Sequence, residues 1–243
     1  MLLGGQTGGT RITDTVYQAH FTLRHGISLN GEGETLCFGC GNDITSIPNH
    51  ELGCLSASGS EVKARHNLIC KSIASALNSI AGYAMREPNP FQDNNKRPDI
   101  EWHVDGRRIY LDVSVTHPLN PSVVAKAARW QLAAAAQREN EKNSKYRMLC
   151  ECISSEFIPI VFETFGGYGA QCKLFMSSLK AIARRNSTLI DGQSIINDML
   201  NQIAYHIISS LSQHLPFIIS VCTVLSRRID HCHTALITGS PIE

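Results

Sequence analysis

The chain has 243 residues, 43% of them hydrophobic, and a formal net charge of +1 at pH 7. This length suits one domain with an appendage or two small domains, and the composition excludes a disordered chain. The small net charge also excludes a whole-molecule attraction to nucleic acid, so that any such contact has to come from a local basic patch.

Membrane and disulfide signals are missing from the sequence. The N-terminus lacks the pattern of a secretory signal peptide, and no stretch reaches the roughly 18 unbroken apolar residues of a membrane helix. The nine cysteines are an odd number, and Cys70, Cys172 and Cys222 stand in apolar helical patterns, where reduced core thiols are usual. We therefore expect an intracellular protein that is not secreted and has no disulfides.

The N-terminal part of the chain predicts a helix and then a metal-binding loop. The helix runs from Thr13 to about Arg24, and a linker follows over residues 28–35. The loop from Cys37 to Cys54 is rich in Gly, Asn and Pro. Its spacing Cys-x2-Cys-x9-His-x3-Cys is typical of a closed, structural zinc site, although four unrelated residues remain the alternative. The predicted ligands are Cys37, Cys40, His50 and Cys54.

The next segments predict a helix and a β-hairpin. The helix begins at Ser60-Glu61, ends at Gly82 and presents an apolar face that includes Ile69, Ile73 and Leu77. After a loop over residues 87–95, two strands flank the turn signal Asp105-Gly106.

The two predicted strands carry Asp99 and Asp112 side by side. A carboxylate on a half-buried strand is costly unless it is paired, hydrogen-bonded or bound to a metal. Two neighbouring carboxylates therefore favour a divalent-cation site, with the carbonyl of Val113 as a third ligand because it adjoins Asp112.

The remaining elements complete an α/β fold, in which helices flank a small mixed β-sheet. We expect a helix over residues 122–146, an edge strand over residues 157–163 that contains a proline, a helix over residues 170–184, and two helices between residues 195 and 228 joined near His214. The predicted organisation is residues 1–34 as N-terminal helix and linker, 35–56 as zinc knuckle and 57–243 as the main domain with C-terminal helices.

Five motifs in order resemble a known family. They are the Cys-Cys-His-Cys knuckle, Arg65-His66-Asn67, Arg97-Pro98-Asp99, Leu111-Asp112-Val113-Ser114-Val115, and Lys142 with Lys145-Tyr146. This set looks like the restriction-like endonuclease region at the C-terminal end of site-specific non-LTR retrotransposon polyproteins, within the PD-(D/E)xK nuclease superfamily. The resemblance covers roughly residues 17–238 and implies a restriction-endonuclease-like fold that cuts DNA.

The resemblance assigns roles to the acidic and basic residues. Asp99 and Asp112 would hold catalytic Mg²⁺, and the cut would leave a 3′ hydroxyl that primes reverse transcription. Ser114 stands where the superfamily usually has its lysine, so that a basic residue of the next helix takes that role: Lys145 is the first choice, followed by Lys142 and Lys126. The alternative for these lysines is an ordinary solvated helix face.

Further residues are implied at the DNA, namely Arg65, His66, Asn67 and Arg97. His66 has an equally good alternative as a hydrogen-bonded histidine on the core side of its helix, and Glu61 is either an additional acid or a helix cap.

The resemblance also implies partners and a location. These are DNA, RNA of the parent element, a reverse transcriptase domain if the chain is part of a longer polyprotein, and the nucleus. Two other functions stay open: a zinc-stapled module of this origin that grips nucleic acid without cutting it, and a structural zinc protein with another partner, which leaves Asp99 and Asp112 unexplained.

Overall fold

The computed structural model describes residues 55–91, 96–186 and 192–213, together with positions 21, 36 and 40–43. Contacts within the chain define two units, one of residues 1–11 and 59–207 and one of residues 12–58 and 208–243. The first unit holds the sheet and both strand aspartates. Most of the predicted N-terminal helix and the chain beyond residue 213 lie outside the described residues.

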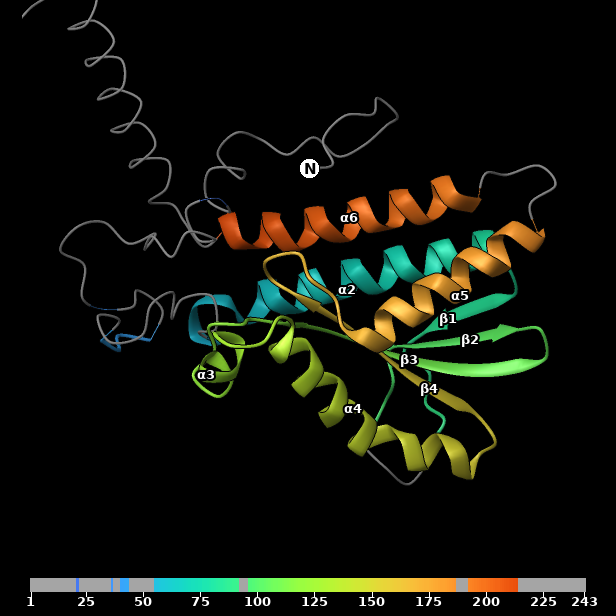
Figure 1. The fold of residues 1–243 in the computed structure, drawn as a ribbon, viewed down its shortest axis with the longest axis horizontal. Coiled ribbons are helices and arrows are strands. Elements are labelled where there is room, and N and C mark those ends of the chain that lie inside the picture. The colour runs from blue at the N-terminus through green and yellow to red at the C-terminus, as the bar shows by residue number, and fades with distance from the viewer. Residues whose placement is uncertain are drawn as a thin grey trace, which may run out of the picture. The chain divides into compact units, whose positions relative to one another are not determined.

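A small four-stranded mixed sheet forms the centre of the first unit (Figure 1). Its order is β1 (Tyr83–Arg86), β2 (Ile100–Val104), β3 (Arg107–Thr116) and β4 (Glu156–Glu163). Neighbouring strands are antiparallel except β3 and β4, which are parallel. The coarse α/β class with helices around a small mixed sheet is therefore confirmed, and Pro159 stands on an edge strand as expected.

The hairpin between β2 and β3 turns at the predicted dipeptide. Asp105 and Gly106 both have positive φ, 49° and 72°, as a two-residue turn of the hairpin type requires. The last pair of the ladder away from this turn is Ile100 with Leu111. Asp99 and Asp112 each adjoin that pair along the chain, so that the hairpin brings the two acidic positions to neighbouring places.

Strand β1 was not predicted. It has only four residues, and three of them are exposed, so that no alternation of apolar and polar residues marks it. Gly82 makes its approach to β2 possible, because a Cβ at this position would lie 1.9 Å from the carbonyl oxygen of His103. The positive φ of Gly82, 73°, also suits the residue that ends the preceding helix.

Helices α2 (Leu55–Ile80) and α5 (Ala170–Asn186) lie over one face of the sheet, and α6 (Gly192–Gln213) packs on the side of α2 that faces away from the sheet (Figure 1). The buried side chains of these helices form one core with the odd-numbered residues of β3. This core includes Ile73 and Leu77 of α2, Phe175 of α5 and Leu111 of β3. Helix α2 begins at Leu55, five residues before the predicted start at Ser60. Ser60 and Glu61 therefore lie inside a continuous helix and do not cap its start.

The predicted helix over residues 122–146 is wrong as a single element. The chain forms a short helix α3 (Val124–Ala127) and a separate helix α4 (Ala133–Cys152), with Leu132 between them in the left-handed region at φ 60°. A distant residue sets the break: the buried carboxylate of Glu163 accepts a hydrogen bond from the amide of Ala135 in the first turn of α4, at 3.0 Å. A carboxylate at this position satisfies a free amide and complements the helix dipole.

Helix α4 lies on the other face of the sheet (Figure 1). There it packs through a small aromatic cluster made by Phe91, Tyr110, Tyr146, Cys150 and Phe157. This cluster fixes the rotation of α4 and thereby decides which of its polar side chains face the sheet. No helix in the described part of the chain is long and apolar enough to cross a membrane.

Candidate active site

Asp99 and Asp112 meet at the end of the β2–β3 ladder. The amide of Asp99 donates to the carbonyl of Leu111 at 2.9 Å, and the Asp99 carboxylate accepts a hydrogen bond from the amide of Val113 at 2.6 Å through Oδ2. This carboxylate is thus held against the backbone of β3, next to Asp112. The sequence predicted the carbonyl of Val113 as a metal ligand. In the structure, the amide of Val113 holds the Asp99 carboxylate in place.

Asp112 is buried, with only 2% of its surface exposed. Burial raises the pKa of its carboxyl group, the negative charge of Asp99 raises it further, and the ammonium of Lys142 opposes both effects. The Asp99 charge therefore acts directly on Asp112, which agrees with the expected proximity of the two carboxylates.

Lys142 is the lysine that the fold brings to the acidic pair. Its Nζ lies 2.5 Å from Oδ2 of Asp112, which confirms that one ammonium of the following helix approaches a strand carboxylate. Both side chains are shielded from water, Lys142 being 14% exposed and Asp112 3%. An ion pair in such a position gains far more from charge attraction than a surface pair.

The first choice from the sequence, Lys145, is not at Asp112. It is exposed, and its ammonium lies over the ring of Tyr146 at 4.6 Å from the ring centre. Lys126, the third choice, is exposed on α3. The signal that distinguishes them is the helical period, because Lys142 stands four residues before the buried Tyr146 whereas Lys145 is rotated about 100° from it.

Tyr146 connects α4 to the segment that carries Asp99. Its hydroxyl donates a hydrogen bond to the backbone carbonyl of Arg97 at 2.8 Å. Burial and the nearby charge of Asp112 raise the pKa of this phenol, so that it remains a donor at neutral pH. The bond holds the Arg97-Pro98-Asp99 segment against the same helix that supplies Lys142.

His66 reaches the acidic pair from α2. Its Nε2 lies 3.1 Å from Oδ1 of Asp99 and 3.5 Å from Sγ of Cys70. The hydrogen bond to Asp99 raises the pKa of His66 above its ordinary value, against the effect of partial burial. The ligand atoms of His66, Cys70 and Asp99 all lie within 4.8 Å of one another, close enough to ligate a single metal ion.

Sequence reasoning did not include Cys70 in the site. It was interpreted as a core thiol, and it is indeed buried, with 4% of its surface exposed. The available signal was its position four residues after His66, a spacing that places two ligands on one face of a helix.

The other residues expected at DNA differ in their exposure. Asn67 and Arg97 are exposed, whereas Arg65 is partly buried and its pKa is lowered by that burial. Their contact with nucleic acid stays a prediction, and the side chain of Glu61 lies outside the described residues.

Of the predicted zinc ligands, only Cys40 is described. It is half-buried in a turn, between Leu36 and Asp43, which form an isolated antiparallel bridge. Cys37, His50 and Cys54 lie outside the described residues, so that the knuckle stays a prediction.

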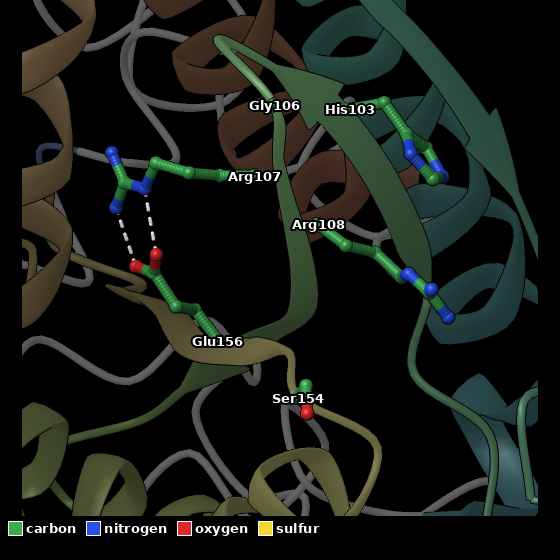
Figure 2. A pocket seen from close by; sticks show the side chains of 6 residues that line it. All are labelled: His103, Gly106, Arg107, Arg108, Ser154 and Glu156. Atoms are coloured by element: carbon green, nitrogen blue, oxygen red, sulfur yellow. Dashed lines mark hydrogen bonds and ion pairs between the residues drawn. The ribbon is translucent and has the colours of Figure 1, made fainter.

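A pocket of about 310 Å³ lies at the turn of the hairpin (Figure 2). Its lining includes Arg107, Arg108 and Glu156. Figure 2 shows the guanidinium of Arg107 joined to Glu156 by two contacts, one of them at 2.6 Å. One of the two arginines is thus already neutralised, and neither strand aspartate lines this pocket.

Comparisons with protein-family models and with curated proteins gave no match. The arrangement of Asp99, Asp112, Lys142 and His66 therefore carries the functional argument by its own chemistry, together with the motifs of the sequence.

Proposed function

We propose that this chain is a Mg²⁺-dependent DNA endonuclease of the PD-(D/E)xK type, as in site-specific non-LTR retrotransposons. The observation that carries the proposal is the contact of 2.5 Å between the Lys142 ammonium and the buried carboxylate of Asp112, beside Asp99. Two carboxylates and one lysine are the groups that phosphodiester hydrolysis needs for metal binding and for charge stabilisation.

The donors suit magnesium. Asp99 and Asp112 offer carboxylate oxygens, which Mg²⁺ prefers. Oδ2 of Asp112 is fully buried. Among the described residues it forms an ion pair with the Lys142 ammonium but accepts no hydrogen bond of good geometry. When bound, the ion would neutralise the scissile phosphate and lower the pKa of a bound water.

The residues of the chain have separate tasks in this proposal. Asp99 and Asp112 would hold the ion, and the Val113 amide and the Tyr146 hydroxyl fix the position of the Asp99 segment. Lys142 would take the role of the superfamily lysine, whose usual position is occupied here by Ser114. Its ammonium would stabilise negative charge on the phosphate.

A second candidate is a module of the same origin that binds nucleic acid without cutting it. The structure offers one specific observation in its favour. Asp112 is paired with Lys142, and Asp99 is hydrogen-bonded to His66, so that both carboxylates have partners without a metal. As parts of either proposal, the knuckle would hold structural zinc, and the partners would be DNA, element RNA and a reverse transcriptase domain in the nucleus.

Nicking of supercoiled plasmid DNA tests the proposal. The full chain is incubated with Mg²⁺, with Mn²⁺ and with EDTA, beside the variants Asp112→Asn and Lys142→Met. We expect metal-dependent nicks with 3′ hydroxyl ends that a DNA polymerase extends directly. Asp112→Asn should abolish cleavage because it removes a ligand of the ion, and Lys142→Met should slow it at least about 100-fold because it removes the charge that stabilises the reacting phosphate.

Lys145→Met is the matched control, because Lys145 lies one turn further along α4 and is exposed. It should cut within about threefold of the parent and lose only DNA affinity, with a shallower dependence of binding on salt. Cleavage that survives Lys142→Met but not Lys145→Met contradicts the assignment. DNA binding without cleavage under either metal favours the binding module. A parent chain that neither binds nor cuts DNA rejects both candidates.

A further inference from the structure

We propose that His66, Cys70 and Asp99 form a site for a thiophilic divalent cation, with Zn²⁺ as the natural ligand, and that this cation competes with Mg²⁺ for Asp99. The competition rests on the proposed function. The site itself rests only on the three residues, which come from helix α2 and from the segment before β2.

Two of the three ligand separations match those of tetrahedral zinc. Zinc bonds of about 2.3 Å to sulfur and about 2.0 Å to nitrogen or oxygen imply ligand separations of about 3.6 Å for S···N and about 3.3 Å for N···O. The corresponding separations are 3.5 Å from Cys70 to His66 and 3.1 Å from His66 to Asp99. The third pair, Sγ of Cys70 and the Asp99 carboxylate, lies within 4.8 Å, so that these two side chains would move closer together around a bound ion.

The backbone that carries the ligands is fixed by other contacts. His66 and Cys70 stand one turn apart on a 26-residue helix. Asp99 is held by its own amide on Leu111, by the amide of Glu87 on its carbonyl at 2.8 Å, and by the Val113 amide on Oδ2. Oδ1 of Asp99 is the oxygen that faces His66. Such preorganisation lowers the entropy cost of binding an ion.

The donor set selects against magnesium. A thiolate and an imidazole are soft or borderline ligands that favour zinc, whereas Mg²⁺ requires six oxygen ligands in octahedral geometry. Three protein ligands leave the fourth tetrahedral position open to water or to an oxygen anion.

The shared carboxylate links the two metals. An ion on Oδ1 of Asp99 places two positive charges close to Asp112, whose carboxylate already interacts with the charge of Asp99. A magnesium ion would then meet both a repelling charge and a partly neutralised ligand. Zinc should therefore inhibit cleavage through Cys70.

Cobalt binding tests the site without any measurement of activity. Co²⁺ bound to a thiolate absorbs in the near ultraviolet, so the full chain is titrated with Co²⁺ beside Cys70→Ser and His66→Gln. We expect each variant to bind one equivalent of cobalt less than the parent. Cys152→Ser, which changes an exposed cysteine, should bind as the parent does.

Two further arms keep the test decisive. Cys40→Ser should remove the separate equivalent expected at the knuckle and leave the Cys70-dependent one. His66→Gln removes a half-buried ligand and keeps Cys70 in place, so that it decides the matter if Cys70→Ser fails to fold by circular dichroism. Equal cobalt binding by the parent and the folded variants would overturn the proposed site.

Zinc inhibition tests the competition. At a fixed Mg²⁺ concentration, zinc is added to the parent and to Cys70→Ser, and each rate is divided by its own zinc-free rate. We expect the parent to be half-inhibited at a zinc concentration at least about tenfold lower than the one that half-inhibits Cys70→Ser. Equal sensitivity overturns the competition, whereas a parent that never cuts defeats the proposed function and leaves the cobalt result to decide the site.

Discussion

The pair of Lys142 and Asp112 gives the sharpest test of how the candidate site is held together. Replacement of Lys142 by methionine keeps most of the side-chain volume and removes the ammonium 2.5 Å from a buried carboxylate. Asp112 then remains as a shielded negative charge beside Asp99. The protein should lose stability through this uncompensated charge rather than through packing.

The size of the loss follows from the burial of both partners. Removal of one member of a fully buried ion pair costs about 3 to 5 kcal/mol. Lys142 keeps 14% of its side-chain surface exposed and Asp112 keeps 3%, so that we expect about 3 kcal/mol for Lys142→Met at pH 7. Lys145→Met should cost about 1 kcal/mol or less, because an exposed cation over an aromatic ring contributes no more than this.

The pH dependence has a definite sign. Without Lys142, the group that lowers the pKa of Asp112 is gone, while burial and Asp99 still raise it. The folded-state pKa then lies further above the unfolded value, and the folded state binds a proton that the unfolded state has lost. Acidification from pH 7 toward pH 5 should therefore reduce the deficit of the variant.

Urea unfolding followed by circular dichroism measures these differences at both pH values. A cycle with Asp112→Asn, Lys142→Met and the double variant isolates the pair, and we expect a coupling of about 2 kcal/mol. Additivity within about 0.5 kcal/mol, or a loss no larger than that of Lys145→Met, would refute the reasoning.

Three more predictions follow from single positions. Burial and the nearby positive charge of Arg65 lower the pKa of His117 to about 4, so that the folded state stays neutral where the unfolded state is protonated. Stability should accordingly fall by up to about 3 kcal/mol as the pH drops from 6.5 to 4, and urea midpoints of His117→Gln should lack this component. Gly82→Ala should cost at least about 2 kcal/mol in the same assay, because its Cβ would lie 1.9 Å from the His103 carbonyl oxygen, and unchanged stability would contradict the close approach of β1. Glu139→Gln should destabilise the start of α5 by about 1 kcal/mol, since this carboxylate accepts from the α5 amides at 2.9 and 3.3 Å, and faster hydrogen exchange confined to that turn would report it.

The sequence by itself determined the elements whose signals are local. Asp105-Gly106 tolerates the positive φ that a two-residue hairpin needs, so that this dipeptide alone pairs β3, which carries Asp112, with β2, which Asp99 directly precedes. The spacing of Ile69, Ile73 and Leu77 likewise indicated the buried face of α2, and Pro159 indicated an edge strand. Each of these depends on neighbours within a few residues.

Tertiary structure decided the features that depend on distant partners. The start of α4 depends on a carboxylate of Glu163, and the choice of Lys142 over Lys145 depends on the rotation that the Tyr146 cluster gives to this helix. The inclusion of Cys70 depends on where Asp99 lies relative to α2. The sequence shows which residues carry charge or a thiol, but their proximity follows from packing between segments far apart in the chain.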